Sequence, residues 1–417
     1  MNVSPLALLG GEPALTTPGP HFTWPPIEEA DRRAVATQLE TSVSVPDRSG
    51  VVADLEDALA SCLGVRHVVT TCTGTAALHS MYAAAGVGPG DEVIVPALTF
   101  HATATPLFHL GAHPVLADVD DRGQLDLDAA ARRVTARTKA VIAVHLWGLP
   151  QDMDALVPFA DEHGLKLLED GSHAYGATWN GRRIGSFGTA AAFSLNGPKP
   201  LSAGEGGFVA TDDDELYYRV LLHGQFNKRC RREIPPGHPL ARFAVTGMGL
   251  KLRIHPLAAA LARAQLTRSE GYLAGRQDIA SRLCAALDGV PGVRVPNVPA
   301  AARPSWYALP LRYEAAEVGG LPLERFLAAL HAEGAVETDR PGSTCPLHTH
   351  PLFQHPGALL PGYADRRPTA AGGYPTAEHV HATTFKLPVW HREDGLRVAD
   401  AYAAAMAKVA AHAKDLM

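Results

Sequence analysis

Residues 190–207 read AAAFSLNGPKPLSAGEGG. The apolar run Ala190–Leu195 predicts a short buried strand, and a polar turn, a single lysine (Lys199) and the glycine-rich turn Gly204–Gly207 follow it. Open α/β sheets bind their ligands at the carboxyl ends of their strands, where this lysine would lie. A partly desolvated lysine can lose its proton there and attack a carbonyl, forming a Schiff base. The alternative is a solvated loop lysine, which is the usual place for this residue type.

The composition excludes several classes of protein. The chain has 417 residues, 46% of them hydrophobic, and a formal net charge of −6 without charge clusters, so we expect neither nucleic-acid binding nor attraction to a membrane surface. It has no apolar run of about 18 residues and no signal-peptide layout at its N-terminus. Its five cysteines are scattered, odd in number and without paired spacing. These features predict a cytoplasmic protein with reduced thiols.

Metal binding is also not expected. The densest group of potential ligands lies in a proline-rich loop and contains Cys345, His348, His350 and His355. Its spacing matches no structural zinc pattern, and no second ligand pair lies nearby in the sequence.

Short β-branched or apolar runs alternate with amphipathic helical stretches from Arg66 to about Gly224. Seven such runs are His67–Cys72, Glu92–Pro96, Pro114–Val119, Ala140–His145, Leu165–Glu169, Ala190–Leu195 and Gly207–Thr211. Continuous apolar strands separated by helices of about ten residues are typical of a mostly parallel sheet with helices on both faces. The fold class is therefore α/β, with a large domain built on a mostly parallel seven-stranded sheet.

The rest of the chain predicts a second, smaller domain. Residues 225–250 lose the alternation and contain a basic stretch, Lys228–Arg232, that would contact a phosphate or form a solvated loop face. A long helical pattern runs from about Pro256 to Leu287, and a strand, a helix, the proline- and histidine-rich loop 341–374 and a final helix follow. We expect a large domain over 1–255, and a linking helix with a small α+β domain over 256–417.

Three further signals stand at the ends of predicted strands. The turn Thr73-Gly74-Thr75 opens a helix, and the free N–H groups of such a turn suit a phosphate. Phe100 follows another strand and either stacks on a planar ligand or belongs to the core.

Asp170 ends the strand that begins at Leu165. An acid leaving an apolar strand must be paired or usefully charged, and a pyridinium nitrogen is one such partner. The alternative is an aspartate that caps a helix. Ser194 precedes Lys199 by five residues and is a candidate hydrogen-bond donor to a phosphate.

The order of these motifs resembles a pyridoxal-phosphate enzyme of the aspartate-aminotransferase fold (fold type I). More specifically, the chain resembles the DegT/DnrJ/EryC1/StrS family of sugar and cyclitol aminotransferases over nearly its whole length. The matching stretches are Gly10–Ala14, Thr73–Leu78, Pro96–Thr103, His145–Pro150, Glu169-Asp170, His173-Ala174, Gly176-Ala177, Phe193-Ser194, Lys199, Gly204–Gly207, Pro346–His348 and Leu387-Pro388.

The resemblance implies two catalytic residues, Lys199 and Asp170. Lys199 would carry pyridoxal 5′-phosphate (PLP) as a Schiff base and then shuttle a proton. Asp170 would pair with the pyridinium nitrogen, and Phe100 would stack on the ring. The amino group would rest on the cofactor as pyridoxamine phosphate between the two halves of the reaction.

The resemblance implies four further contacts to the cofactor. Gly74, Thr75 and Ser194 would bind its phosphate, and His173 occupies a position near the ring hydroxyl. The family often has asparagine, supplied by the neighbouring subunit, where this chain has Lys251. Lys251 would serve there as a point charge rather than an amide.

The function implied is amino transfer from glutamate or glutamine to a keto group of a sugar, a cyclitol or a related intermediate of secondary metabolism, such as antibiotic biosynthesis. A homodimer with shared active sites is implied as well. Two alternatives stay open at this point: a dehydratase or other elimination enzyme of the same family, and a non-catalytic PLP-binding regulator. Family dehydratases replace the lysine by histidine, so Lys199 favours transamination.

Overall fold

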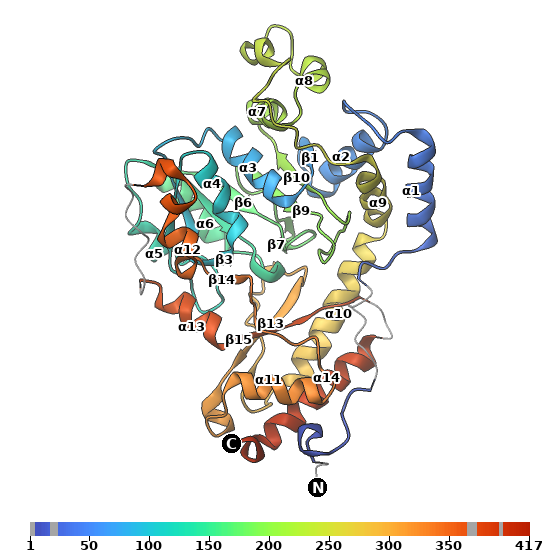
Figure 1. Ribbon diagram of the computed structural model, residues 1–417, viewed down its shortest axis with the longest axis vertical. Coiled ribbons are helices and arrows are strands. Elements are labelled where there is room, and N and C mark those ends of the chain that lie inside the picture. The colour runs from blue at the N-terminus through green and yellow to red at the C-terminus, as the bar shows by residue number, and fades with distance from the viewer. Residues whose placement is uncertain (1–4, 17–23, 365–372, 392–394) are drawn as a thin grey trace.

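The computed structural model describes residues 5–16, 24–364, 373–391 and 395–417. Its large sheet has seven strands in the order β1-β10-β9-β6-β5-β2-β4. Their bounds are β1 His67–Thr71, β2 Glu92–Pro96, β4 His113–Ala117, β5 Thr138–Val144, β6 Lys166–Asp170, β9 Ala190–Ser194 and β10 Gly207–Thr211. Neighbouring strands pair in parallel except at β10, which is antiparallel to both β1 and β9. The predicted seven-stranded, mostly parallel sheet is confirmed (Figure 1).

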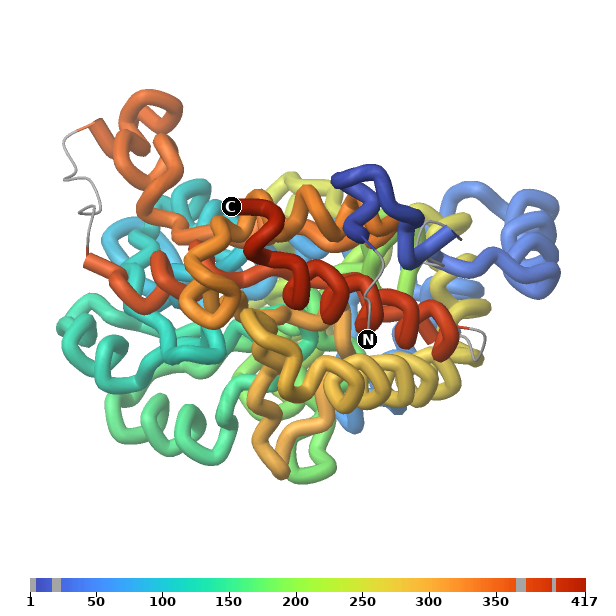
Figure 2. The backbone as a smooth tube through the Cα atoms, turned by 90° about the horizontal axis from the view of Figure 1, so that it is seen from below, coloured from blue at the N-terminus to red at the C-terminus, as the bar shows by residue number. Residues whose placement is uncertain are grey.

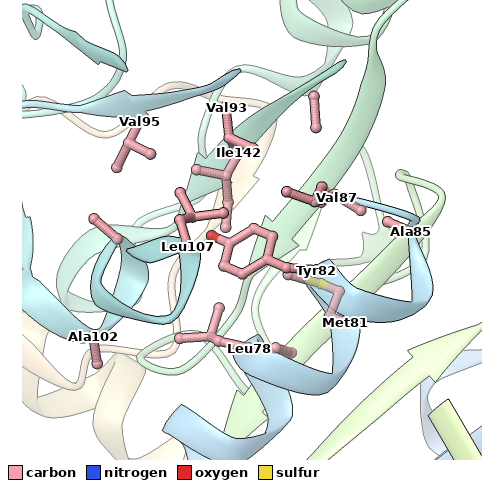
Figure 3. Close-up of a cluster of buried hydrophobic side chains, with 14 of the residues drawn as sticks. Leu78, Met81, Tyr82, Ala85, Val87, Val93, Val95, Ala102, Leu107 and Ile142 are labelled. Atoms are coloured by element: carbon pink, nitrogen blue, oxygen red, sulfur yellow. The ribbon is translucent and has the colours of Figure 1, made fainter. Parts of the chain in front are cut away.

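Helices cover both faces of this sheet because side chains along a strand alternate between its faces. On one face, Val93 and Val95 of β2 pack in a cluster with Met81 and Tyr82 of α3 (Gly74–Ala84), as Figure 3 shows. Between them in the sequence, Ile94 belongs to a different cluster, formed with α6 (Met153–Glu162). Strands buried on both sides read as continuous apolar runs, which is why the sequence located them.

Other helices of this part are α1 Glu29–Thr41, α2 Gly50–Leu63, α4 Thr105–His109, α5 Leu127–Ala131, α7 Asp214–Gly224, α8 Lys228–Glu233 and α9 Pro256–Leu266. Four short strands complete it: β3 Leu98–Phe100, β7 Thr178–Trp179, β8 Arg182–Arg183 and β12 Ala302–Arg303. No helix in the described part of the chain has the length and apolar character needed to cross a membrane.

The C-terminal part has its own sheet and core. The sheet order is β11-β13-β15, with bounds Val293–Arg294, Ala308–Tyr313 and Thr384–Pro388. The helices here are α10 Ser269–Leu287, α11 Leu323–Ala332, α12 Pro351–Gln354, α13 Pro375–Thr383 and α14 Gly395–Ala411. Apolar side chains of α10, α11 and α14 form a separate buried cluster around Leu309, Phe326 and Met406. Phe353 of α12 and Val380 of α13 instead belong to the core of the large sheet.

The N-terminal segment packs on this C-terminal part. Leu6 and Leu15 belong to its core, and the backbone N–H groups of Ala7 and Ala14 donate to the Glu333 carboxylate at 2.8 and 2.9 Å. Figure 2 shows the segment beside α14. The predicted large domain over 1–255 includes this segment, whereas Leu6 and Leu15 belong to the other core. The division at residue 255 itself stays a prediction.

Three local expectations need correction. The helical pattern 256–287 forms two helices, α9 and α10, with a break at Thr267-Arg268. There the Arg268 guanidinium pairs with the buried Asp31 of α1 at 2.6 Å. The segment 225–250 includes α8, and the loop 341–374 includes β14 (Thr344–Pro346), which pairs with β3.

The basic stretch on α8 is only partly a surface. Arg229 is 2% exposed and donates from Nη1 and Nη2 to the buried Glu56 carboxylate at 2.9 and 2.8 Å. Its Nε donates to Glu233 at 2.9 Å. Arg229 therefore neither contacts a phosphate nor forms a solvated loop face. It pairs with two carboxylates of the same chain, and its bond to Glu56 joins α8 to α2.

Candidate active site

A cavity of about 350 Å³ opens at the carboxyl ends of β1, β6 and β9. Of the eight site residues that we predicted, seven line it: Gly74, Thr75, Phe100, Asp170, His173, Ser194 and Lys199. The eighth, Lys251, does not line this cavity. It is exposed, and its backbone forms an isolated antiparallel β-bridge with Gln225. The topology of the sheet therefore gathers the strand-end residues into one place, as expected of a parallel sheet.

Lys199 is held by the turn that follows β9. Its backbone N–H donates to the carbonyl oxygen of Asn196, and its own carbonyl accepts from Trp24 Nε1, both at 3.0 Å. The side chain is partly accessible, but its amine is surrounded by protein and lies 4.4 Å from the centre of the Tyr307 ring. Burial lowers the pKa of Lys199 from 10.5 to about 8, although the negative charge of Asp170 opposes the shift. A fraction of this amine is therefore neutral, and nucleophilic, near neutral pH.

Asp170 is the last residue of β6 and is 5% exposed. Its carboxylate accepts from Thr103 Oγ1 at 2.7 Å and from the Ser172 backbone N–H at 3.0 Å. The Thr103 hydroxyl is in turn 2.9 Å from that of Thr99. No helix follows Asp170, so it is not a helix cap; its two donors orient a buried carboxylate that lines the cavity.

The first turn of α3 forms one wall of the cavity. Thr73 caps the helix, with its side-chain oxygen accepting from the Ala76 N–H at 3.0 Å. The helix start is a favourable place for an anion. Gly74 is required here because a Cβ would lie 2.7 Å from the Cβ of Ser194. The close approach of α3 and β9 thus brings Gly74, Thr75 and Ser194 together at the start of this helix.

His173 and Tyr307 form a second wall. Their rings stack with centroids 4.3 Å apart and an angle of 13° between planes. Burial, followed by the positive charges of Lys199 and Lys386, holds the pKa of His173 well below its usual range. The imidazole is therefore neutral, and its Nδ1 accepts from the Trp147 N–H at 3.3 Å.

Sequence reasoning missed three residues of this site. Tyr307 directly precedes β13, but nothing in the sequence brings it to Lys199. Thr344 of β14 reaches the cavity because β14 pairs with β3, register Thr344 to Phe100. Thr103 lies within one of the matched stretches. Its position four residues after Thr99 could have indicated that the two hydroxyl groups hydrogen-bond to each other.

The loop that contains Cys345, His348 and His350 forms contacts within the protein. Cys345 Sγ lies 2.9 Å from His350 Nε2, and His348 Nε2 lies 2.9 Å from Glu378. Among the described residues, no group of three His, Cys, Asp or Glu side chains is arranged to hold a metal ion.

The cavity fits PLP residue by residue. It offers a buried amine at Lys199, a buried carboxylate at Asp170, an aromatic ring at Phe100 and an anion site at the start of α3. A cofactor that carries an aldehyde, a protonatable ring nitrogen, a flat ring face and a phosphate would use all four groups. The fold and the site thus define a Schiff-base enzyme of the PLP type.

The chain belongs to the DegT/DnrJ/EryC1/StrS aminotransferase family, whose model matches residues 26–402. It is 36% identical over 346 residues to the spore coat polysaccharide biosynthesis protein SpsC of Bacillus subtilis, covering 81% of this chain and 84% of SpsC. It is 34% identical over 336 residues to the L-glutamine:scyllo-inosose aminotransferase of Streptomyces griseus, covering 79% of each.

Among solved structures, it is similar to DesI with its TDP-sugar product, with a TM-score of 0.75, 31% identity and 96% of each chain covered. The protein is therefore an aminotransferase that depends on PLP, and its fold is that of fold type I.

Proposed function

We propose that this aminotransferase takes its amino group from glutamate or glutamine and delivers it to a keto group of a sugar, a cyclitol or a related secondary-metabolite intermediate. The observation that carries the proposal is that the Lys199 amine and the Asp170 carboxylate line the same cavity. The relative named for L-glutamine and scyllo-inosose supports the donor and a cyclitol acceptor. DesI, with its TDP-sugar product, supports a sugar acceptor.

Lys199 is the proposed site of covalent attachment. The low pKa of its amine, about 8, leaves a usable neutral fraction that could bond to the aldehyde of a bound cofactor. The same amine, when free, would be placed to accept and return a proton. When bound, PLP supplies an electron sink for the negative charge left on that carbon.

Asp170 is proposed to face the ring nitrogen and keep it protonated. The hydrogen bonds from Thr103 and Ser172 fix the carboxylate in the orientation that this requires. His173, which is neutral, is assigned to the ring hydroxyl, and Phe100 to the ring face. These two assignments rest on position in the cavity and on the family resemblance.

Gly74, Thr75 and Ser194 are proposed to bind the phosphate. The start of α3 supplies N–H donors and a favourable dipole, and Ser194 adds a hydroxyl next to it. No side chain of this group carries a positive charge, so a cation from elsewhere would complete the site.

We place that cation on a second copy of the chain. Lys251 is exposed and does not line the cavity of its own chain. Large apolar side chains are exposed near it in the sequence, namely Phe243, Val245, Met248 and Leu250. An exposed apolar group of this kind marks a protein interface. A homodimer would cover this surface and bring Lys251 of the partner subunit to the phosphate.

Sedimentation of the wild type and of Val245→Asp tests the dimer. We expect a dimer for the wild type and a monomer with at least tenfold weaker PLP binding for the variant. Lys251→Ala should weaken PLP binding similarly while leaving the dimer intact. A wild type that sediments as a monomer and binds PLP tightly would remove this part of the proposal.

The activity itself is tested by separate half-reactions on the PLP-loaded protein. Glutamate, glutamine and other amino acids are screened for conversion of the cofactor to its amine form, followed by absorbance. Keto sugars and keto cyclitols are then screened for reversal. Conversion by neither glutamate nor glutamine would reject the donor assignment, and reversal by simple keto acids only would reject the acceptor class.

A further inference from the structure

A second cavity, of about 460 Å³, adjoins the Lys199 cavity. Pro198 and Tyr307 line both. The second cavity lies between the two parts of the chain, because its wall includes Trp24 and Gly197 on one side and Lys386 and Pro388 of β15 on the other. None of the roles assigned above uses it.

Its most unusual feature is Arg276 of α10. This arginine is 2% exposed, and its Nη1 donates to the carbonyl oxygen of Trp306 at 2.6 Å. Its Nε is buried without a hydrogen-bond partner among the described residues. Its guanidinium carbon lies 4.4 Å from the centre of the Trp24 ring.

No carboxylate of the described residues lies within ion-pairing distance of Arg276, unlike Arg229, which is equally buried and holds two. Burial lowers the pKa of Arg276, but an arginine keeps its charge at neutral pH. An unpaired buried charge is costly, so buried charges in proteins are generally paired. The cavity thus presents one buried cation that lacks an anion.

The other charged groups around the cavity have partners within the protein. Lys386 Nζ lies 2.5 Å from Asp339, and the Glu337 carboxylate accepts from the Tyr402 hydroxyl at 2.9 Å. With Arg276, the lining therefore carries two cations and two carboxylates. One carboxylate group of an amino donor would supply the anion that the Arg276 guanidinium lacks.

The cavity is connected to Lys199 through two aromatic residues. Trp24 packs its ring against Arg276 and donates from Nε1 to the carbonyl oxygen of Lys199. The Tyr307 ring lies below the Lys199 amine and lines both cavities. A small molecule held at Arg276 would therefore lie against the residues that position Lys199.

We propose that the Arg276 cavity is the binding site for a carboxylate of the amino donor. This inference rests on the proposed function, in which glutamate or glutamine supplies the amino group. It assigns the recognition of the donor to a guanidinium that can form two parallel hydrogen bonds with a carboxylate.

Calorimetric titration of glutarate into the PLP-loaded protein tests the site without turnover. Glutarate carries the donor's carboxylates and has no amine to react. Loss of a charge-assisted hydrogen bond in Arg276→Gln should raise its dissociation constant about 10- to 100-fold. The matched control is Arg312→Gln, because Arg312 of β13 likewise forms no ion pair with a carboxylate of the described residues and donates to Thr383 Oγ1 and the Asp121 carbonyl oxygen. The control should bind glutarate like the wild type.

Unchanged glutarate binding in Arg276→Gln, with the melting temperature and cofactor absorbance of the wild type, would overturn the proposal. If this variant fails to fold, Arg276→Lys tests the same point. Lysine keeps the charge but loses the planar fork, so binding about three- to tenfold weaker is expected. Unchanged binding in this variant is likewise contrary to the proposal.

The donor half-reaction separates this inference from the function on which it rests. In Arg276→Gln, the KM for the donor should rise while the KM for the acceptor stays the same. A wild type that binds glutarate through Arg276 but takes no amino group from glutamate or glutamine would reject the donor assignment alone. An effect confined to the acceptor KM would reject the Arg276 proposal alone.

Discussion

The depressed pKa of Lys199 predicts an unusual pH dependence for cofactor uptake. With a pKa of about 8, roughly a quarter of the Lys199 amine is neutral at pH 7.5, against about one part in a thousand for an ordinary lysine. Burial disfavours the charged amine, and the charge of Asp170 only partly offsets this. Uptake of PLP by the apoprotein should therefore rise with pH up to about 8 and level off above it.

The assay is the rate at which the lysine adduct absorbance appears when PLP is mixed with apoprotein between pH 6.5 and 9.5. A lysine model compound in the same buffers corrects for the titration of PLP itself. Asp170→Asn removes the charge that raises the pKa of Lys199, so its plateau should begin at a lower pH. A corrected rate that keeps rising about tenfold per pH unit through pH 9.5, as for an ordinary lysine, would refute the desolvation argument.

Two further variants test the walls of the cavity. Gly74→Ala would place a Cβ 2.7 Å from the Cβ of Ser194, so PLP affinity, measured by titration, should fall at least tenfold; Gly88→Ala, where nothing lies within 4 Å, should leave it unchanged. Thr103→Val removes one donor to Asp170, which costs about 1–2 kcal/mol and should weaken PLP binding about tenfold. Thr99→Val should have a smaller effect, since its hydroxyl reaches Thr103 rather than Asp170; equal effects would argue against a specific role for Thr103.

The sequence located the large sheet because its strands are buried on both faces and read as uninterrupted apolar runs. It did not specify the direction of β10, which depends on a short connection from Lys199 through Gly204–Gly207 rather than on strand composition. Nor did it locate the break between α9 and α10. The helical pattern continues through Thr267-Arg268, and the contact formed at the break, the ion pair of Arg268 with Asp31, joins residues far apart in the chain.

The same limit applies to the site. Strand-end residues such as Asp170 and Lys199 could be found in the sequence, because parallel topology alone brings them to one edge. Tyr307 and Arg276 could not, since they come from the C-terminal part and their positions depend on how it packs against the sheet. Arg229 was misinterpreted for a related reason, because its partner Glu56 lies 173 residues away.

Identification of the lysine that binds PLP tests the central claim most directly. The PLP-loaded protein is reduced with borohydride, digested and analysed by mass spectrometry, with Lys199→Ala treated in parallel. We predict that the pyridoxyl label lies on the peptide containing Lys199 and is absent from the variant, which should keep the wild-type melting temperature as an apoprotein. A label on any other lysine of the wild type, or an equally labelled variant, would contradict the account.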